Sequence, residues 1–142
     1  MEIRIAITHD TKRICSFFSK HLSKKNDALY SDEFFCSMGV RAAIKRGQMI
    51  IAVEGKIIAG VARFYRKKKT QQISLYQFAV DSKHRGTGLL LNMLEQLRVP
   101  DIVVLCPKES TFNNYYNKTG WILMDQIGEF NQWRLKRKYL LP

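Results

Sequence analysis

A short basic glycine segment between a strand and a helix constrains this chain more than any other feature. Residues 83–88 (KHRGTG) follow the apolar residues 78–80 and run directly into the leucine-rich residues 89–94. Glycines let the backbone turn sharply and approach a ligand closely, and the first N–H groups of a helix have no partner inside it. Together with the charges of Lys83 and Arg85, this arrangement predicts a binding site for a phosphate group.

Two familiar phosphate-binding loops do not fit this segment. A Walker loop has a longer glycine spacing that ends in Gly-Lys-Ser or Gly-Lys-Thr, which residues 83–88 lack. A dinucleotide fingerprint needs a glycine at the position that Lys83 occupies. Taken alone, the segment is also compatible with a basic helix entry that binds nothing.

The length and composition of the chain predict one globular domain. It has 142 residues, of which 46% are hydrophobic, enough for a single core and too many for a disordered tail. We therefore expect residues 1–142 to form a single domain. The chain begins without the apolar run of a signal peptide, and no later segment could span a bilayer. These features predict a soluble, cytoplasmic protein with no membrane partner.

The formal charge of +12 restricts the partners. A polycationic acceptor such as a polyamine would be repelled, whereas a phosphorylated cofactor or a nucleic acid would be attracted. The Lys and Arg residues occur in small groups, and each group by itself is typical of a solvated turn or helix end. The sequence does not tell whether these groups converge on one face, so a nucleic acid is one candidate partner among several.

The cysteines favour neither a metal site nor a disulfide framework. Cys15, Cys36 and Cys106 are odd in number and lack the spacing of metal ligands or of paired cysteines. Cys106 ends an apolar strand, where a small hydrophobic side chain is the ordinary role. We expect reduced thiols and no metal.

Hydrophobic periodicity predicts seven strands and four helices. Their order is β-α-α-β-β-β-α-β-α-β-β, an α+β fold whose mixed sheet carries helices on both faces. Residues 102–105 are apolar throughout, which is typical of a buried central strand beside a parallel neighbour. The expected strands are residues 3–7, 49–53, 56–65, 73–80, 102–105, 121–128 and 129–136, and the expected helices are residues 11–22, 31–46, 89–99 and 111–119.

The second and third helices have predicted buried faces. The second is expected to begin at a Ser31 cap, with Asp32 and Glu33 in its first turn, and to end at Gly47. Helical spacing assigns its inner face to Phe35, Met38 and Ala42. The same spacing gives the third helix a buried stripe of Leu90, Met93, Leu94 and Leu97.

From end to end, this order of elements resembles that of the GNAT superfamily of acetyl-CoA-dependent N-acetyltransferases. Residues 83–88 resemble that family's Gln/Arg-x-x-Gly-x-Gly/Ala pyrophosphate loop, with Lys83 in place of Gln or Arg. Residues 115–121 (YYNKTGW) resemble its Phe-Tyr-Glu-Lys-x-Gly-Phe segment after the fifth strand. Both motifs fall on the expected elements, so the resemblance implies a single GNAT-like acetyltransferase domain over residues 1–142.

The resemblance implies that acetyl-CoA is a co-substrate and where it lies. In this family the strands equivalent to residues 73–80 and 102–105 splay apart, with the pantetheine arm of the coenzyme between them. The main chain of the glycine segment would bind the pyrophosphate. The family often has an Asn nearer the helix start, where this chain has Glu109, so Asn113 is a departure from its pattern. The implied coenzyme-binding residues are Phe78, Ala79, Val80, Lys83, Arg85, Gly86, Thr87, Gly88, Leu89 and Asn113.

Tyr116 matches the general acid of the family. A phenol within hydrogen-bond reach of the sulfur can protonate or stabilise the departing thiolate. Its distance from Gly120 and Trp121 in the motif selects Tyr116 over Tyr115. The alternative is that both tyrosines only pack, because an aromatic stripe on a helix usually faces the core.

A general base is missing from its expected place. Many relatives carry a Glu on the fourth strand, whereas residues 73–80 (ISLYQFAV) contain no carboxylate, and Gln77 or Tyr76 could only hold a water. Deprotonating a lysine amine with a pKa of about 10.4 at pH 7 costs roughly 4–5 kcal/mol, against about 1 kcal/mol for an α-amine. The omission favours a weakly basic acceptor. Asp32 and Glu33 could supply a base from across the cleft, although a role at the helix start is more ordinary.

The favoured function is an N-acetyltransferase that moves the acetyl group of acetyl-CoA to a primary amine by direct attack. The acceptor is open and includes an α-amine or an RNA-linked amine. The alternative is a GNAT-fold protein that binds nucleic acid without transferring acetyl groups, although the intact glycine segment argues against it. The final hairpin, with Phe130 and Trp133, could complete the sheet or pack on a second subunit, so both a monomer and a homodimer are open.

Overall fold

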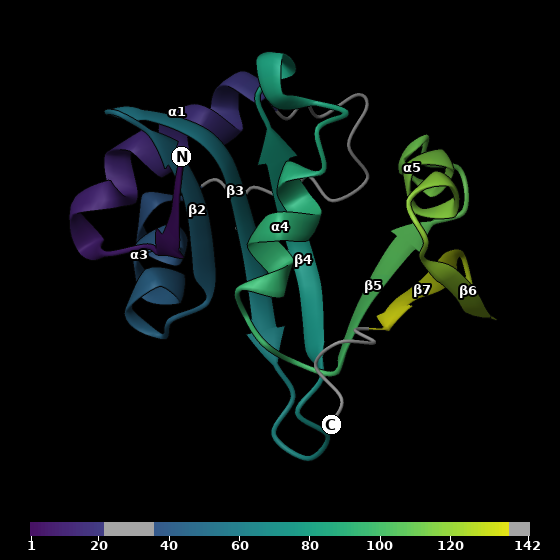
Figure 1. Ribbon diagram of the computed structural model, residues 1–142. Helices are drawn as coiled ribbons and strands as arrows, with labels where there is room; N and C mark the ends of the chain where they lie inside the picture. Colours follow the sequence, from purple (N-terminus) through teal and green to yellow (C-terminus); the bar gives the residue numbers. More distant parts are fainter. Residues whose placement is uncertain (22–35, 137–142) are drawn as a thin grey trace.

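The centre of the structure is a mixed β-sheet. The computed structural model describes residues 1–21 and 36–136. Within these residues seven strands form one sheet with the order β1-β2-β3-β4-β5-β7-β6 (Figure 1), in which β4 and β5 are the parallel neighbours. The strands are β1 (Glu2–Ile5), β2 (Met49–Glu54), β3 (Ile57–Arg66), β4 (Ile73–Val80), β5 (Asp101–Pro107), β6 (Ile122–Ile127) and β7 (Phe130–Lys136).

Helices cover both faces of this sheet. The buried side chains form two clusters, one beneath α1 and α3 and one beneath α4 and α5. The predicted order of elements and the α+β fold class are confirmed, while the predicted start of the second helix lies outside the described residues. The helices are α1 (Thr11–His21), α3 (Ser37–Lys45), α4 (Leu89–Glu95) and α5 (Phe112–Lys118), with short 3₁₀ turns η1 (Thr8–Asp10) and η2 (Ser82–His84).

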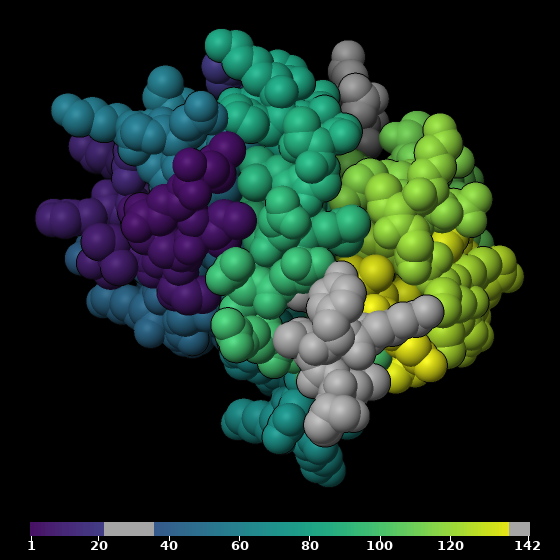
Figure 2. All heavy atoms as spheres, in the orientation of Figure 1, coloured from purple at the N-terminus to yellow at the C-terminus, as the bar shows by residue number. Residues whose placement is uncertain are grey.

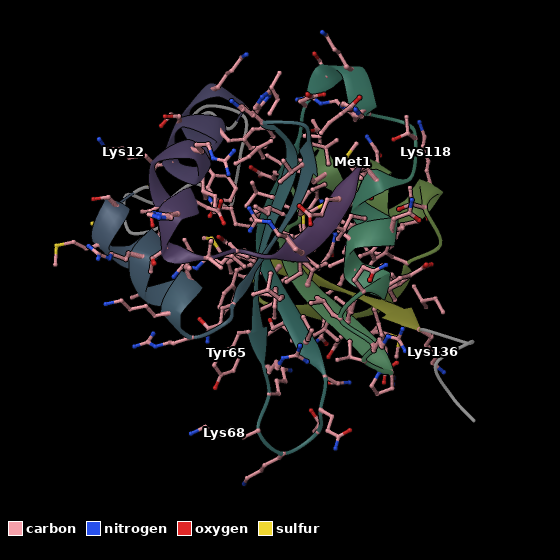
Figure 3. The ribbon with its side chains drawn as sticks, turned by 60° about the vertical axis from the view of Figure 1, so that its left-hand side comes forward. Met1, Lys12, Tyr65, Lys68, Lys118 and Lys136 are labelled. Carbon is pink, nitrogen blue, oxygen red and sulfur yellow. The ribbon has the colours of Figure 1, made fainter. Side chains whose placement is uncertain are left out.

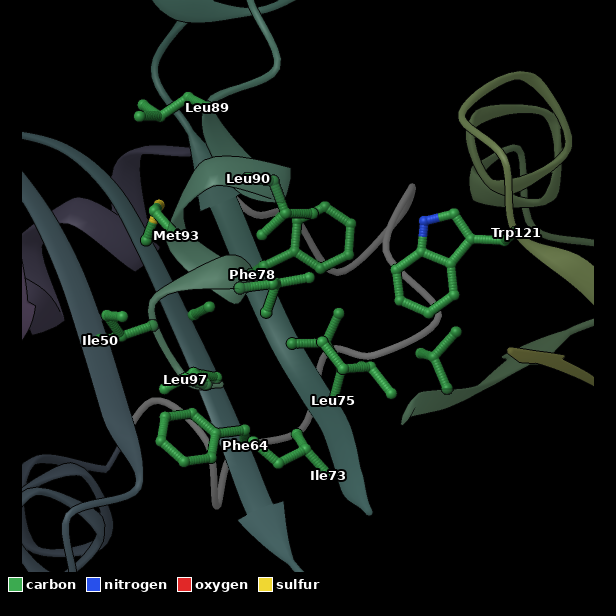
Figure 4. Close-up of a cluster of buried hydrophobic side chains, with 14 of the residues drawn as sticks. Ile50, Phe64, Ile73, Leu75, Phe78, Leu89, Leu90, Met93, Leu97 and Trp121 are labelled. Carbon is green, nitrogen blue, oxygen red and sulfur yellow. The ribbon is translucent and has the colours of Figure 1, made fainter. Parts of the chain in front are cut away.

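α4 packs closely on the middle of the sheet, and its predicted apolar stripe is buried. The approach is close because a Cβ at Gly60 of β3 would lie only 3.0 Å from the sulfur of Met93. In the space-filling view, atoms of the N-terminal strand lie directly beside those of α4, and Ile3 packs against the same cluster (Figure 2). The stripe consists of Leu90, Met93, Leu94 and Leu97, and its partners include Phe64, Ile73 and Leu75 (Figure 4).

On the other face, α3 buries a different side from the predicted one. Of the predicted inner face, Met38 is 79% exposed, Ala42 is only half-buried, and Phe35 lies outside the described residues. Val40, Ala43 and Ile44 are buried instead. The helix has two apolar stripes on roughly opposite sides, one through Met38 and one through Val40, because residues two positions apart in a helix lie on different faces. The stripe of Val40, Ala43 and Ile44 faces α1 and the sheet. Periodicity identified the helix but selected the wrong stripe.

The final hairpin completes the sheet. β7 pairs with β5 over its whole length, and β6 forms the outer edge. Trp133 of β7 is buried in the cluster beneath α4 and α5, whereas Phe130 is 43% exposed. Two roles were considered for this hairpin, completing the sheet and packing on a second subunit, and the structure shows the hairpin completing the sheet.

The two parallel strands separate early. β4 and β5 pair only at Ile73 with Ile102 and at Ser74 with Val103. Beyond these positions they diverge toward their carboxyl ends, as the family resemblance implies (Figure 1). Figure 4 shows Phe78 on the β4 side of this split and Trp121 on the opposite side.

A buried carboxylate holds the start of the chain together. Asp10 is 1% exposed and accepts hydrogen bonds from Arg4 at 2.8 and 3.0 Å, from Arg13 at 2.7 Å and from the N–H of Ile7 at 2.8 Å. The bond from the Arg4 guanidinium is the largest cause that lowers the pKa of Asp10 far below its ordinary 3.8. The stability from this cluster is therefore present above pH 3.8 and is lost as the pH falls toward the lowered pKa.

We predict that Asp10→Ala lowers the free energy of unfolding by about 2–4 kcal/mol, because two guanidinium groups and one N–H lose a shared acceptor. Urea unfolding at pH 7 measures the change. Glu2→Ala is the control, since Glu2 is 70% exposed and lies 3.6 Å from Arg4. The control should change the stability by less than about 1 kcal/mol, and equal losses in the two variants would contradict the prediction.

Candidate active site

A cavity of about 410 Å³ opens at the carboxyl end of β4, where β4 and β5 have separated. Its walls come from segments far apart in the sequence: the end of α1, the end of β4, the glycine segment, the first turn of α4, and α5. Most of the predicted coenzyme-binding residues meet here. Those that line the cavity are Phe78, Ala79, Val80, Arg85, Gly86, Gly88 and Leu89.

The glycine segment adopts a conformation that glycine favours. Gly86 and Gly88 have φ values of +77° and +78°, and a Cβ at either position would meet nothing within 4 Å. Arg85, with φ −67° and ψ 142°, precedes Gly86 as in a type II turn. Gly88 precedes α4, and no described group accepts a hydrogen bond from the main-chain N–H of Leu90 or Leu91. These donors are available to a ligand.

His84 anchors the glycine segment to the turn between β2 and β3. Its Nδ1 lies 2.7 Å from Oδ1 of Asp81, and its Nε2 lies 2.8 Å from Oε2 of Glu54. The hydrogen bond with Asp81, followed by the one with Glu54, raises the pKa of His84 above 6.5. The hydroxyl of Thr87 donates to the carbonyl of His84 at 2.5 Å. His84 is thus a structural anchor at the edge of the cavity.

Tyr116 lies directly behind the cavity wall and is fully buried. Its ring packs on Phe78 and Tyr115, which both line the cavity, with centroid separations of 6.3 and 5.5 Å. Trp121 and Trp133 pack on it as well. Its hydroxyl finds no hydrogen-bond partner among the described residues, which is unusual for a buried phenol. Burial raises the pKa of Tyr116 well above 10, so the hydroxyl keeps its proton at neutral pH.

Asn113 lies off the cavity, and its amide is fully engaged. Nδ2 donates to the main-chain carbonyls of Pro107 and Ser110, each at 2.9 Å. Oδ1 accepts from Nε1 of Trp133 at 2.9 Å and from Nδ2 of Asn131 at 3.1 Å. These bonds tie α5 to the end of β5 and to β7. They fix the position of the helix that carries the two tyrosines.

The strand that ends at the cavity carries no acidic side chain. Gln77 is fully buried there, and its amide finds no partner among the described residues. Tyr76 is 40% exposed and stacks on Tyr65. Asp32 and Glu33, the alternative source of a base, lie outside the described residues.

Several cavity residues were not indicated by the sequence, because they come from elements whose relative position it does not reveal. His21, at the end of α1, lines the cavity, and burial, followed by the charges of Lys20 and Arg85, lowers its pKa below 6.5. Phe112 and Thr119, at the two ends of α5, line the cavity as well. Two predicted residues, Lys83 and Thr87, belong to the glycine segment but do not line the cavity.

The cysteines occupy separate environments. Cys106 is buried, and burial raises the pKa of its thiol, which agrees with a small hydrophobic role. Cys36 is exposed, and Cys15 is partly buried. Across the part of the chain that is described, no group of three or more His, Cys, Asp and Glu side chains could hold a metal ion. No helix there has the length and apolar character needed to cross a membrane.

The sequence profile of the acetyltransferase (GNAT) domain matches residues 20–136. This match spans most of the chain, so the chain belongs to the GNAT acetyltransferase family. Its class is that of the acetyl-CoA-dependent N-acetyltransferases. The family resemblance seen in the two motifs is confirmed. No curated protein sequence matches the chain significantly.

Solved structures share this fold at low sequence identity. A GNAT-family acetyltransferase from Listeria monocytogenes is 16% identical, with a TM-score of 0.77 over 96% of this chain and 94% of that chain. PaiA N-acetyltransferase from Thermoplasma acidophilum, solved with coenzyme A, is 15% identical, with a TM-score of 0.71 over 96% and 98%. N-acetylglutamate synthase from Neisseria gonorrhoeae, solved with coenzyme A and N-acetyl-glutamate, is 13% identical, with a TM-score of 0.71 over 95% and 34%.

We predict that Asn113→Ala lowers the free energy of unfolding by about 2–4 kcal/mol, because the indole N–H of Trp133 and two carbonyls lose their partner at once. Urea unfolding followed by tryptophan fluorescence measures the loss. Asn114→Ala is the matched control, since Asn114 is the next residue of α5 and is exposed. A loss of the same size in both variants would show that the Asn113 amide has no special role.

Proposed function

We propose that the protein transfers the acetyl group of acetyl-CoA to a weakly basic amine at the cavity at the end of β4. The observation that carries this proposal is the junction of the glycine segment with the split between β4 and β5. The glycine segment lines the cavity together with Phe78 and Tyr115. Tyr116, whose hydroxyl has no partner among the described residues, packs behind these two rings. A long ligand with a phosphate at one end and a reactive group at the other matches this arrangement.

The residues present fit a coenzyme of this kind. The space at Gly86 and Gly88 admits a bulky anion. The N–H groups at the start of α4, which have no acceptor among the described residues, suit its oxygens. Lys83 and Arg85 would add positive charge, with Thr87 and Leu89 shaping the segment. The apolar side chains of Phe78, Leu90 and Phe112 suit an alkyl arm. The main-chain groups of Phe78 and Val80, which point away from β3, would bind its amides, whereas those of Ala79 face β3.

In the proposed reaction the thioester supplies the acetyl carbonyl and a thiolate leaving group. The amine nitrogen bonds to the carbonyl carbon, the carbon–sulfur bond breaks, and the amine releases a proton to solvent. Tyr116 would donate a hydrogen bond to the departing sulfur. A phenol with a pKa above 10 is a weaker acid than an ordinary thiol, whose pKa is about 8.5. Tyr116 would therefore stabilise the thiolate without giving up its proton completely.

The proposed class of acceptor rests on the composition of β4, the strand that ends at the cavity. Since β4 has no carboxylate, the amine has to arrive largely deprotonated or lose its proton cheaply. An α-amine near pKa 7.8 meets this requirement at pH 7 for about 1 kcal/mol, and a lysine side chain does not. Asn113 would contribute by positioning α5, and a direct contact between Asn113 and the coenzyme stays a prediction.

We predict that Tyr116→Phe lowers kcat by about 10–100-fold, the equivalent of one hydrogen bond to a charged group. The KM for acetyl-CoA should change little, because the lost bond forms only as the thiolate departs. Thiol release at acetyl-CoA concentrations varied up to saturation, with amino-acid amides as acceptors, measures both constants. Tyr115→Phe, on the adjacent cavity-lining residue, is the control. Equal kcat values for wild type and Tyr116→Phe would reject this role.

We predict that Gly86→Ala weakens coenzyme A binding by about tenfold or more. A side chain at φ +77° strains the segment by about 1–2 kcal/mol and fills space that the pyrophosphate needs. Titration calorimetry measures the affinity. Gly47→Ala controls for the backbone strain, because Gly47 has φ +71° and equally open surroundings but lies after α3, off the cavity. If both variants bind coenzyme A like the wild type, the glycine segment is not the pyrophosphate site.

A further inference from the structure

A second hollow adjoins the cavity and is strongly basic. It is a groove of about 620 Å³ between α1, the turn from β2 to β3, and η2, and His21 lines both the groove and the cavity. Its apolar floor includes Phe17 and Ile58. We refer to it as the basic groove, because the charged side chains along it include Lys12, Arg13, Lys20, Lys56 and Lys83.

The positive charge of the basic groove is not neutralised from within. Arg13 is engaged by the carboxylate of Asp10 at 2.7 Å and by the carbonyl of Lys56 at 2.9 Å. The acidic residue of the lining, Asp81, bonds to His84. The four lysines, in contrast, form no ion pair with any carboxylate of the described residues. Four lysines from three separate segments thus line one groove, and none of them is paired with a carboxylate in the part of the chain that is described.

The spacing of these charges suits a chain of anions. Lys12 and Lys20 both line the groove and are eight positions apart on α1, which separates them by roughly 12 Å along the helix axis. One phosphate cannot satisfy both ammonium groups, whereas successive phosphates of a polymer can. Lysines act as point charges and lack the planar fork with which arginine grips a single phosphate. The concave shape fits a linear polymer better than a flat lipid surface.

Positively charged side chains line both the groove and the cavity. His21 lines both hollows. Burial lowers the pKa of His21, and the charges of Lys20 and Arg85 lower it further. A polymer seated in the groove would therefore pass beside the cavity.

We infer that the basic groove binds the phosphate backbone of a nucleic acid, and that the acceptor amine is carried on that nucleic acid. The place of the acceptor amine rests on the proposed acetyl transfer, whereas the binding of the nucleic acid rests on the groove alone. Phosphates would lie along Lys12, Lys20, Lys56 and Lys83, with an attached amine at the neighbouring cavity. This substrate class agrees with the weakly basic acceptor proposed above.

Binding of a labelled single-stranded RNA of roughly 20 nucleotides, measured by fluorescence anisotropy between about 50 and 200 mM salt, tests the inference. With four phosphate contacts, log K should fall against log salt with a slope of about −3. Lys12→Gln with Lys20→Gln should make this slope shallower by about 1.4, because each lost contact contributes about 0.7. Coenzyme A binding should be unchanged in this double variant.

The matched control is Lys68→Gln with Lys69→Gln. It removes the same charge from the turn between β3 and β4, far from Lys12 (Figure 3). The control should keep the wild-type slope. Equal slopes in the two double variants would overturn the inference, as would wild-type protein that does not bind the RNA.

Two further measurements test whether the groove binds a different anion. A polyglutamate of similar length that competes as well as unlabelled RNA would assign the groove to acidic proteins and overturn the inference. A different result is that the Lys12 and Lys20 variant binds coenzyme A more weakly but binds dephospho-coenzyme A, which lacks the phosphate on the ribose, like the wild type. That result would assign the groove to the coenzyme's own phosphate and would overturn the inference as well. Failure of the proposed acetyl transfer would give a different result. Neither the wild type nor any variant would then bind coenzyme A, while the wild type would still bind the RNA.

Discussion

The early end of the pairing between β4 and β5 is the constraint on which the site depends. If the two strands paired throughout, the edge of β4 that carries the main-chain groups of Phe78 and Val80 would bond to β5, and no cavity would exist. Because pairing stops at Ser74 and Val103, that edge stays available while β3 holds the other edge in register. A polar main-chain edge thus faces a cavity with a largely apolar lining, and buried main-chain groups of this kind need a partner.

The far wall of the split is built separately. β5 is held by β7, and Asn113 joins α5 to both strands through Pro107 and Trp133. The aromatic rings around Tyr116 fill the space between this wall and Phe78. The position of the proposed hydrogen-bond donor is therefore set by β7 and α5, whereas the position of the glycine segment is set by β4 and η2. A ligand that spans the cavity would touch both parts.

Local patterns predicted the fold well, because strand alternation, glycine turns and the stripe of α4 are written in neighbouring residues. The glycine segment was found for the same reason, since its strand, turn and helix are contiguous. The inner face of α3 was wrong, because Met38 and Val40 lie on two apolar stripes and only tertiary packing selects one. The bonds of Asn113, the place of His21 and the convergence of the lysines depend on segments distant in sequence, and no local pattern carries them.

The bridge formed by His84 gives the protein a response to acidity. The pKa of His84 is raised because its imidazolium donates to Asp81 and Glu54 together. The stability that these two hydrogen bonds give is fully present below the ordinary pKa of 6.5. As the pH rises through the raised pKa, the neutral ring keeps a single N–H and one carboxylate loses its donor. Asp81 leads into the glycine segment and Glu54 into the turn that holds Lys56. The hydrogen bonds of His84 therefore hold the β2–β3 turn to the glycine segment most strongly below pH 6.5, and this link weakens as the pH rises through the raised pKa.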